Sequence, residues 1–235
     1  MPRLNWTFLG EIPYLQALQL QYRLASKVAR GADPVLLLLE HPPSITLGRQ
    51  ADPGNLNLSE TEYKKRGIGV FNVLRGGDVS LHCRGQLVGY PIANLRELKY
   101  PVPAWVRGQA RVIERFLYKH EIAAVWSDVH PGVWIDDKKI AALGFHISRG
   151  ISTHGFALNI NPDLSLFNTI IPCGLRHRQV TSMYEHTKKL PEMAQAAREI
   201  ASLTVETFGL AGECFICAED IFEEAADDTV ISAIS

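Results

Sequence analysis

The sequence predicts a single α/β domain that spans residues 1–235 and is built on a mixed β-sheet. Segments with helical periodicity alternate with short apolar segments that have the character of strands. Hydrophobic residues make up 46% of the chain, which is enough for a sizeable core. Every connection between these segments fits a short loop, so no linker divides the chain into separate domains.

The first predicted elements are an amphipathic helix and a buried strand. Apolar residues three and four positions apart mark the helix, and Gly31 ends it. The uninterrupted apolar run Val35–Leu39 indicates a strand that is covered on both faces. The residues expected on the buried face of the helix are Leu15, Leu18, Tyr22, Ala25 and Ala29.

The next segment predicts a short capped helix followed by a strand. Ser59 and Glu62 have the spacing of a capping box, and Gly67 ends the helix that they begin. Val70–Leu74 then predicts a strand that leads into a pair of glycines.

The second half of the chain predicts two helices around three successive strands. Asp136-Asp137 and Arg149-Gly150 supply the turns between the strands. The acidic stretch 219–235 is typical of a solvated helix face or tail. The predicted elements are a helix over Trp105–Leu117, strands over Val133–Ile135, Lys139–Ile147 and Thr153–Ile160, and a helix over Met193–Phe208 that Gly209 closes.

Charge and cysteine content exclude several classes of protein. The net charge of -1 offers no clustered basic surface for nucleic acid or for a membrane. Four cysteines are too few for a disulfide scaffold and are typical of a reducing compartment. The N-terminus has no secretory or transit signal, and the longest apolar run, Val35–Leu39, is too short to cross a bilayer. We therefore expect a cytoplasmic protein.

Two segments combine glycines with polar side chains. The first, Arg75-Gly76-Gly77-Asp78-Val79-Ser80-Leu81-His82, follows a predicted strand, and its glycines allow a close backbone approach to a ligand. A plain glycine hairpin explains this segment equally well. The second, Thr153–Asn159, predicts a strand in which Gly155 and Ala157 leave space. A packed strand with one satisfied histidine, His154, is the alternative.

Two further residues have the chemistry of a catalytic pair. Lys139 begins an apolar strand, where partial burial would lower the pKa of its amine and make it a proton acceptor. Cys173 lies between proline and glycine, on a tight turn that can present a thiol to a cavity. Each residue has a simpler interpretation. Lys139 could be a turn lysine that points to solvent, and Cys173 could be a buried, inert cysteine.

Taken together and in order, these segments resemble the lipoyl(octanoyl) transferase family. The family pattern is an R-G-G…H stretch, G-Q-L-V-G-Y-P, K-I-A-x-x-G, H-G-x-A-L-N and P-C-G. The matching residues are Arg75 to Gly77 with His82, Gly85 to Pro91, Lys139 to Ala141 with Gly144, His154 to Asn159 and Pro172 to Gly174, and the stretches Leu39–Pro43 and Thr46–Arg49 also match. Any one of these motifs is weak, whereas five in register from about Leu36 to Ser182 are strong.

The chain departs from the family pattern beside His82. The family usually has Tyr-His-Gly-Pro-Gly there, whereas this chain has Leu81 before the histidine and Cys83-Arg84 after it. The resulting loop is bulkier and more basic, which bears on the entrance of the acyl pocket.

The resemblance implies the fold of the biotin and lipoate ligase catalytic domain, and roles for particular residues. Cys173 would carry an octanoyl thioester, and Lys139 would activate the thiol, without a cofactor or a metal. The acyl slot and its backbone donors would come from Arg75 to His82, from Ala142-Leu143-Gly144 and from Gly155-Phe156-Ala157, with His154 as a candidate supporting residue.

The implied donor is octanoyl-acyl carrier protein. The implied acceptors are a specific lysine in the lipoyl domains of 2-oxoacid dehydrogenase complexes and in the glycine cleavage H protein.

Three other functions remain open at this point. An ATP-dependent lipoate or biotin ligase shares the fold but requires an adenylate site, for which no biotin-ligase-type glycine-arginine-rich loop is present. An amidotransferase between lipoyl domains differs little in sequence. A non-catalytic interaction protein would instead bind zinc through His82, Cys83, His154 and Cys173, although these spacings match no usual zinc motif. Cys214 and Cys217 have metal or redox spacing but no second pair, and the residues between them favour a strand.

Overall fold

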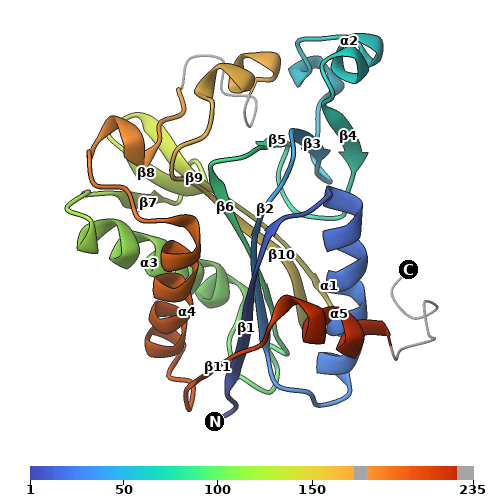
Figure 1. Cartoon of the computed structure of the whole chain (residues 1–235), viewed down its shortest axis with the longest axis vertical. Coiled ribbons are helices and arrows are strands. Elements are labelled where there is room, and N and C mark those ends of the chain that lie inside the picture. Colours follow the sequence, from blue (N-terminus) through green and yellow to red (C-terminus); the bar gives the residue numbers. More distant parts are fainter. Residues whose placement is uncertain (172–178, 227–235) are drawn as a thin grey trace.

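A computed structural model describes residues 1–171 and 179–226 and contains two β-sheets (Figure 1). The large sheet has the order β11-β1-β2-β6-β10-β9-β8-β7. Strand β1 runs parallel to β2 and β11, and the other neighbours in this sheet are antiparallel, so the sheet is mixed, as predicted. Its strands are β1 (Leu4–Glu11), β2 (Val35–Glu40), β6 (Gln86–Ile92), β7 (Val125–Ser127), β8 (Gly132–Ile135), β9 (Lys138–Ser148), β10 (Ile151–Asn159) and β11 (Glu213–Phe215).

Helices cover both faces of the large sheet (Figure 1). Helices α3 and α4 pack on one face, where Trp105 and Phe208 join the larger hydrophobic core. Helices α1 and α5 pack on the other face. None of the helices in the described part of the chain has the length and apolar character needed to span a membrane. The helices are α1 (Tyr14–Ala29), α2 (Glu60–Lys65), α3 (Val102–Lys119), α4 (Met193–Phe208) and α5 (Ala218–Ala226), and short 3-10 turns cover Pro53–Asn55, Leu164–Thr169 and Met183–Glu185.

The small sheet has the order β4-β3-β5 and lies with α2 at one end of the large sheet (Figure 1). Its strands are β3 (Ser44–Leu47), β4 (Gly69–Asn72) and β5 (Val79–His82). Ile45, Tyr63 and Leu81 form part of its own core. This arrangement places the loop between β4 and β5, which carries the paired glycines, beside the large sheet.

The local turn and cap predictions are confirmed. The side chain of Ser59 caps α2 and Glu62 completes the capping box. Gly209 ends α4 in the left-handed conformation, with φ of 63°. Asp136 and Arg149 also have positive φ, in the turns on either side of β9. These features depend on a few neighbouring residues, so the sequence alone is sufficient to identify them.

Two predictions about packing are wrong. Ala25 is buried as expected, but the rest of the buried face of α1 carries Ala17, Leu20, Leu24 and Val28, whereas Leu15 is 52% exposed. The helix has apolar residues on more than one side, and its contacts with β6 and β10 select the face. The strand expected over Val70–Leu74 instead spans Gly69–Asn72, and Leu74 is exposed.

Candidate active site

A cavity of about 500 Å³ lies between the β4–β5 loop and strands β9 and β10. Tyr14 of α1 contributes to one part of its wall, and Trp126 of β7 and Pro131 contribute to another. Lys139 and His154 also line it. Thirteen of the fourteen residues that the family resemblance assigns to the acyl slot line this cavity, and they are Arg75, Gly76, Gly77, Asp78, Val79, Ser80, His82, Ala142, Leu143, Gly144, Gly155, Phe156 and Ala157.

Leu81 is the exception among the expected slot residues. Its side chain is buried with Ile45 and Tyr63 in the core of the small sheet, because successive side chains on a strand point to opposite faces. It touches only a smaller neighbouring cavity of about 30 Å³. The position at which the family usually has tyrosine therefore lies in the core of the small sheet and does not line the large cavity.

Arg75 attaches the glycine loop to the small sheet. Its guanidinium donates to the hydroxyl and to the carbonyl oxygen of Thr46, at 2.7–3.0 Å, and to the carbonyl oxygen of Gly76 at 2.9 Å. Gly76 N–H donates to Phe145 O on β9 at 2.9 Å. Gly77 has φ of +84°, which favours glycine over any residue with a side chain. The loop is therefore hydrogen-bonded both to the small sheet and to β9, whereas the sequence alone did not distinguish a ligand-binding loop from a plain glycine hairpin.

The opposite wall is formed by the antiparallel pair β9 and β10. Ala157 faces Ala142 and Gly155 faces Gly144 across the ladder, so small residues leave the space that the cavity occupies. A Cβ atom at Gly155 would collide with the carbonyl oxygen of Gly89 on β6. Gly155 is therefore required by the close approach of two strands.

Lys139 lies at the start of β9 and is only 7% exposed. Its Nζ donates to Pro131 O at 3.3 Å and lies 5.0 Å from the centre of the Trp134 ring. The backbone of Lys139 pairs with the segment 179–181, because its N–H donates to Gln179 O and its carbonyl accepts from Thr181 N–H. Lys139 is therefore a buried lysine that lines the cavity, and its role as a proton acceptor stays a prediction.

Cys173 falls outside the described residues, so its geometry relative to Lys139 stays a prediction. The chain on either side is anchored. Ile171 N–H donates to Asn55 O at 2.8 Å, and Gln179 O accepts from Lys139 N–H at 3.0 Å. The residue at which the chain resumes is therefore hydrogen-bonded directly to Lys139.

Three buried histidines lie near one another at this site. Burial, followed by the electrostatic influence of His41 and Arg75, lowers the pKa of His82 to about 3. Burial also lowers the pKa of His154 to about 3 and that of His41 to about 4. All three rings are therefore neutral near pH 7. His41 donates from Nδ1 to Ile12 O and accepts at Nε2 from the Tyr90 hydroxyl, both at 2.8 Å.

His154 differs from the satisfied strand histidine considered as an alternative. Its φ is +56°, an unusual conformation for a residue with a side chain. Its backbone N–H donates to Gln21 Oε1 at 2.7 Å, but its Nε2 has no hydrogen-bond partner among the described residues. The backbone is held from α1 while the ring lines the cavity.

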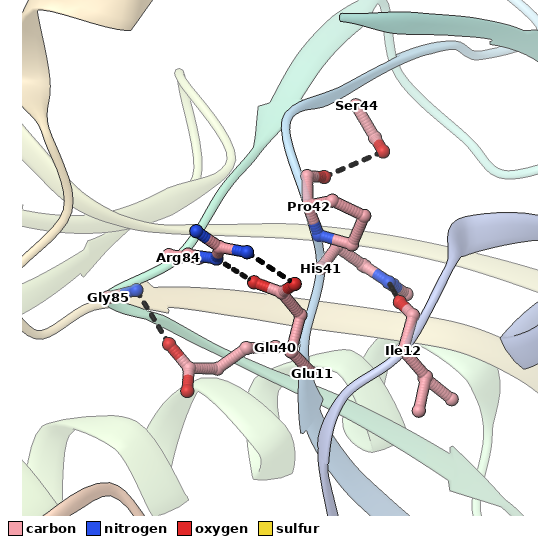
Figure 2. A network of polar contacts seen from close by, with 8 residues as sticks. All are labelled: Glu11, Ile12, Glu40, His41, Pro42, Ser44, Arg84 and Gly85. Carbon is pink, nitrogen blue, oxygen red and sulfur yellow. Dashed lines mark hydrogen bonds and ion pairs between the residues drawn. The ribbon is translucent and has the colours of Figure 1, made fainter. Parts of the chain in front are cut away.

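The turn Cys83-Arg84-Gly85 connects β5 to β6, and none of its residues lines the large cavity. Figure 2 shows Arg84 and Gly85 directed toward Glu11 and Glu40. Arg84 is exposed and donates to both carboxylate oxygens of Glu11. Glu40 accepts from Gly85 N–H at 2.6 Å. Cys83 is buried, and burial raises the pKa of its thiol to about 12. The bulkier, more basic turn therefore leaves the large cavity unobstructed.

The zinc alternative gains no support from these side chains. Within residues 1–171 and 179–226, no cluster of three or more histidine, cysteine or acidic side chains is arranged to hold a metal ion. His82 Nδ1 is hydrogen-bonded to Gln86, and Cys83 lies in the turn beyond it.

The fold defines the class of protein. The chain superimposes on the archaeal bi-partite lipoate protein ligase of Thermoplasma acidophilum with a TM-score of 0.73 and 17% identity, over 96% of this chain and 91% of the other. It superimposes less closely on the biotin protein ligase of Aquifex aeolicus, with a TM-score of 0.53 and 16% identity, over 89% and 71% of the two chains. The mixed sheet is therefore that of the lipoate and biotin protein ligases, as the resemblance implied.

Sequence similarity narrows this class. The family model of the lipoyl protein ligase A/B catalytic domain matches residues 13–203. The octanoyltransferase of Alkaliphilus metalliredigens is 47% identical over 184 residues, which are 77% of this chain and 84% of that protein. The chain therefore belongs to the lipoyl protein ligase A/B catalytic-domain family and, within it, to the octanoyltransferases, which are acyltransferases.

Proposed function

We propose that the protein transfers an octanoyl group from octanoyl-acyl carrier protein to a lysine of a lipoyl domain, with Cys173 as the intermediate carrier. The observation that supports this most directly is the position of Lys139. Its amine is buried at the edge of the cavity, and its backbone is paired with the chain that follows the cysteine segment.

The proposed reaction has two steps at one site. The Cys173 thiolate attacks the carbonyl carbon of the donor thioester, and the carrier protein leaves as a free thiol. The acceptor amine then attacks the new thioester, an amide forms, and Cys173 is released as a thiol. Lys139 accepts the proton of the thiol in the first step, and either Lys139 or solvent removes the proton from the amine in the second.

The cavity suits an eight-carbon chain without charge. Small residues on β9 and β10 and the glycine loop leave the space, and the two buried histidines that line it, His82 and His154, are neutral. Burial of each methylene contributes about 0.8 kcal/mol, so a chain two carbons shorter binds about tenfold more weakly. Donors of different length are therefore discriminated mainly in binding.

The partners follow from this reaction. The donor is an acyl carrier protein, and the acceptors are the lipoyl domains of 2-oxoacid dehydrogenase complexes and the glycine cleavage H protein. Because the donor is already a thioester, the transfer needs no nucleotide, and all the groups that react are on the protein and its two substrates.

Mass spectrometry of the loaded protein tests the proposal. Incubation with octanoyl-acyl carrier protein is expected to add one octanoyl mass to Cys173, and neutral hydroxylamine is expected to remove it. Cys173→Ala is expected to take up no label and to transfer nothing to a lipoyl domain. Labelling of the alanine variant to the same extent contradicts the assignment of Cys173.

A further inference from the structure

A chain of amide hydrogen bonds runs from the segment beside Lys139 to His82. Asn159 Nδ2 lies 2.9 Å from Thr181 O, and Gln86 Nε2 lies 2.9 Å from Asn159 Oδ1. Gln86 Oε1 in turn lies 2.9 Å from His82 Nδ1. The three side chains, His82, Gln86 and Asn159, come from three different strands, β5, β6 and β10.

The direction of every bond in this chain is fixed by its ends. A carbonyl oxygen only accepts, so Asn159 must donate to Thr181 O, and Asn159 Oδ1 must then accept from Gln86. Gln86 Nε2 also lies 3.4 Å from Leu81 O, which requires the same orientation. Gln86 Oε1 is therefore an acceptor, and His82 must carry its proton on Nδ1.

The other ring nitrogen of His82 is consequently a lone-pair acceptor. His82 lines the cavity and its Nδ1–H is engaged by Gln86, so Nε2 is the nitrogen left for the cavity side. A buried N–H group without a partner is more costly than an acceptor in the same position. The tautomer that Gln86 selects thus removes an N–H donor from the wall that faces the acyl chain.

We propose that Gln86 and Asn159 are positioning residues that determine specificity for an apolar acyl chain, by holding His82 as the Nδ1–H tautomer. This inference rests on the proposed octanoyl transfer. The two amides act through His82 and do not touch the reacting atoms. Their hydrogen bonds end at Thr181, whose N–H donates to Lys139 O. One continuous series of hydrogen bonds therefore connects His82 with Lys139.

Groups from several elements surround the His82 ring. Tyr14 of α1 lies 6.1 Å and His41 5.8 Å from it, centre to centre, and Arg75 and His154 act on it through their electrostatic fields. Burial is the largest cause of its lowered pKa, and the hydrogen bond that His82 donates to Gln86 opposes that shift.

The turn between His82 and Gln86 is itself fixed, which limits the freedom of the ring. Gly85 N–H donates to Glu40, and Arg84 pairs with Glu11 (Figure 2). Gly85 O accepts from the N–H groups of Ile160 and Asn161, which directly follow β10. The turn therefore holds His82 and Gln86 close to each other.

The tautomer is measured directly by long-range nitrogen–proton correlation NMR of protein labelled with nitrogen-15 histidine. His82→Asn identifies the signal. We expect His82 to be neutral at pH 7, with its proton on Nδ1 and a bare Nε2. A proton on Nε2, or a cationic ring, overturns the proposal whether or not the protein transfers octanoate.

Two matched variants measure the effect on specificity. Gln86→Met removes the acceptor of Nδ1–H, so the His82 ring can carry its proton on Nε2 or bind a water there. We expect the KM for octanoyl-acyl carrier protein to rise about tenfold, because a polar group then lies beside the acyl chain. Gln109→Met is the control. Gln109 is equally buried on α3, and neither of its amide atoms has a partner in the described part of the chain, so the KM should not change. An unchanged KM in folded Gln86→Met contradicts the proposal.

Gln86→Glu adds a pH-dependent readout that a loss of packing would not produce. A carboxylate still accepts from Nδ1–H but raises the pKa of His82, so the ring becomes a cation as the pH falls. We expect the KM of this variant to rise between pH 8 and pH 6 while the wild-type value stays level. A level KM in the variant contradicts the proposal. An inactive wild-type protein refutes the proposed function instead, and the NMR result still decides the tautomer.

Discussion

Replacement of Lys139 by arginine separates two ways in which this residue can act. A fixed positive charge favours the thiolate of Cys173 without exchanging a proton, whereas a general base must accept one. Arginine retains the charge but does not accept a proton near neutral pH. We expect Lys139→Arg to lose about 10²–10⁴-fold in turnover, the usual contribution of a positioned proton-transfer group.

The structure predicts a small change in stability for the same variant. Lys139 makes one hydrogen bond to Pro131 O and one contact with the ring of Trp134, and a guanidinium can make both. The expected loss is about 1 kcal/mol, which lowers the Tm by about 2–4 °C in a protein of this size. A large fall in turnover with a small fall in Tm therefore reports on chemistry.

The assay is steady-state transfer from octanoyl-acyl carrier protein to a lipoyl domain, with the rate of thiol alkylation measured in parallel. Lys139→Arg is expected to keep part of its reactivity toward a small alkylating agent, because the cation remains. Lys138→Ala is the control, since Lys138 precedes Lys139 on β9 and should tolerate the change. Near-normal turnover in Lys139→Arg refutes proton transfer by this lysine. A severe loss of turnover in Lys138→Ala, with little loss in Lys139→Ala, would show that Lys138 and not Lys139 is the lysine that acts with Cys173.

Three further predictions follow from the site. Cys83→Ser should keep most of the activity, because Cys83 is buried and its raised pKa keeps it a thiol; a loss as deep as that of Cys173→Ala contradicts this. Transfer from octanoyl-acyl carrier protein should proceed without nucleotide, and strict dependence on free octanoate with ATP and magnesium favours a ligase. Gly77→Ala should lower the free energy of unfolding by about 1–2 kcal/mol more than Gly76→Ala in chemical denaturation, because only Gly77 has positive φ; equal losses would show that the strain is absent.

The cavity wall shows which parts of the site the sequence could identify. The family motifs are contiguous stretches, and thirteen of the fourteen residues that they led us to expect line the cavity. Leu81 was misplaced because a contiguous motif on a strand includes side chains of both faces. Tyr14 and Trp126 were missed because they come from α1 and β7, which no motif includes.

The alternating sequence of β1 carried a signal that the sequence analysis did not use. Leu4, Trp6 and Phe8 follow the period of a strand, and the first two are buried. The face of α1 was a different case, since its apolar residues permit two stripes and only contact with β6 and β10 decides between them.

The sequence by itself determined the elements whose signals are local. The capping box at Ser59, the glycine stop at Gly209 and the turns around β9 depend on residues that are neighbours in the chain. Together with the motifs, they defined the α/β class and the candidate residues of the site. Side-chain period and turn chemistry act over a few residues, so they can be read without knowledge of the rest of the chain.

Only the tertiary structure decided what these residues do to one another. The tautomer of His82 depends on Gln86, Asn159 and Thr181, which are brought together because β6 and β10 are neighbours in the large sheet. The burial of Lys139 depends on Pro131 and on the chain at 179–181. Hydrogen-bond direction and desolvation are set by atoms distant in sequence, and no local pattern encodes which of those atoms will meet.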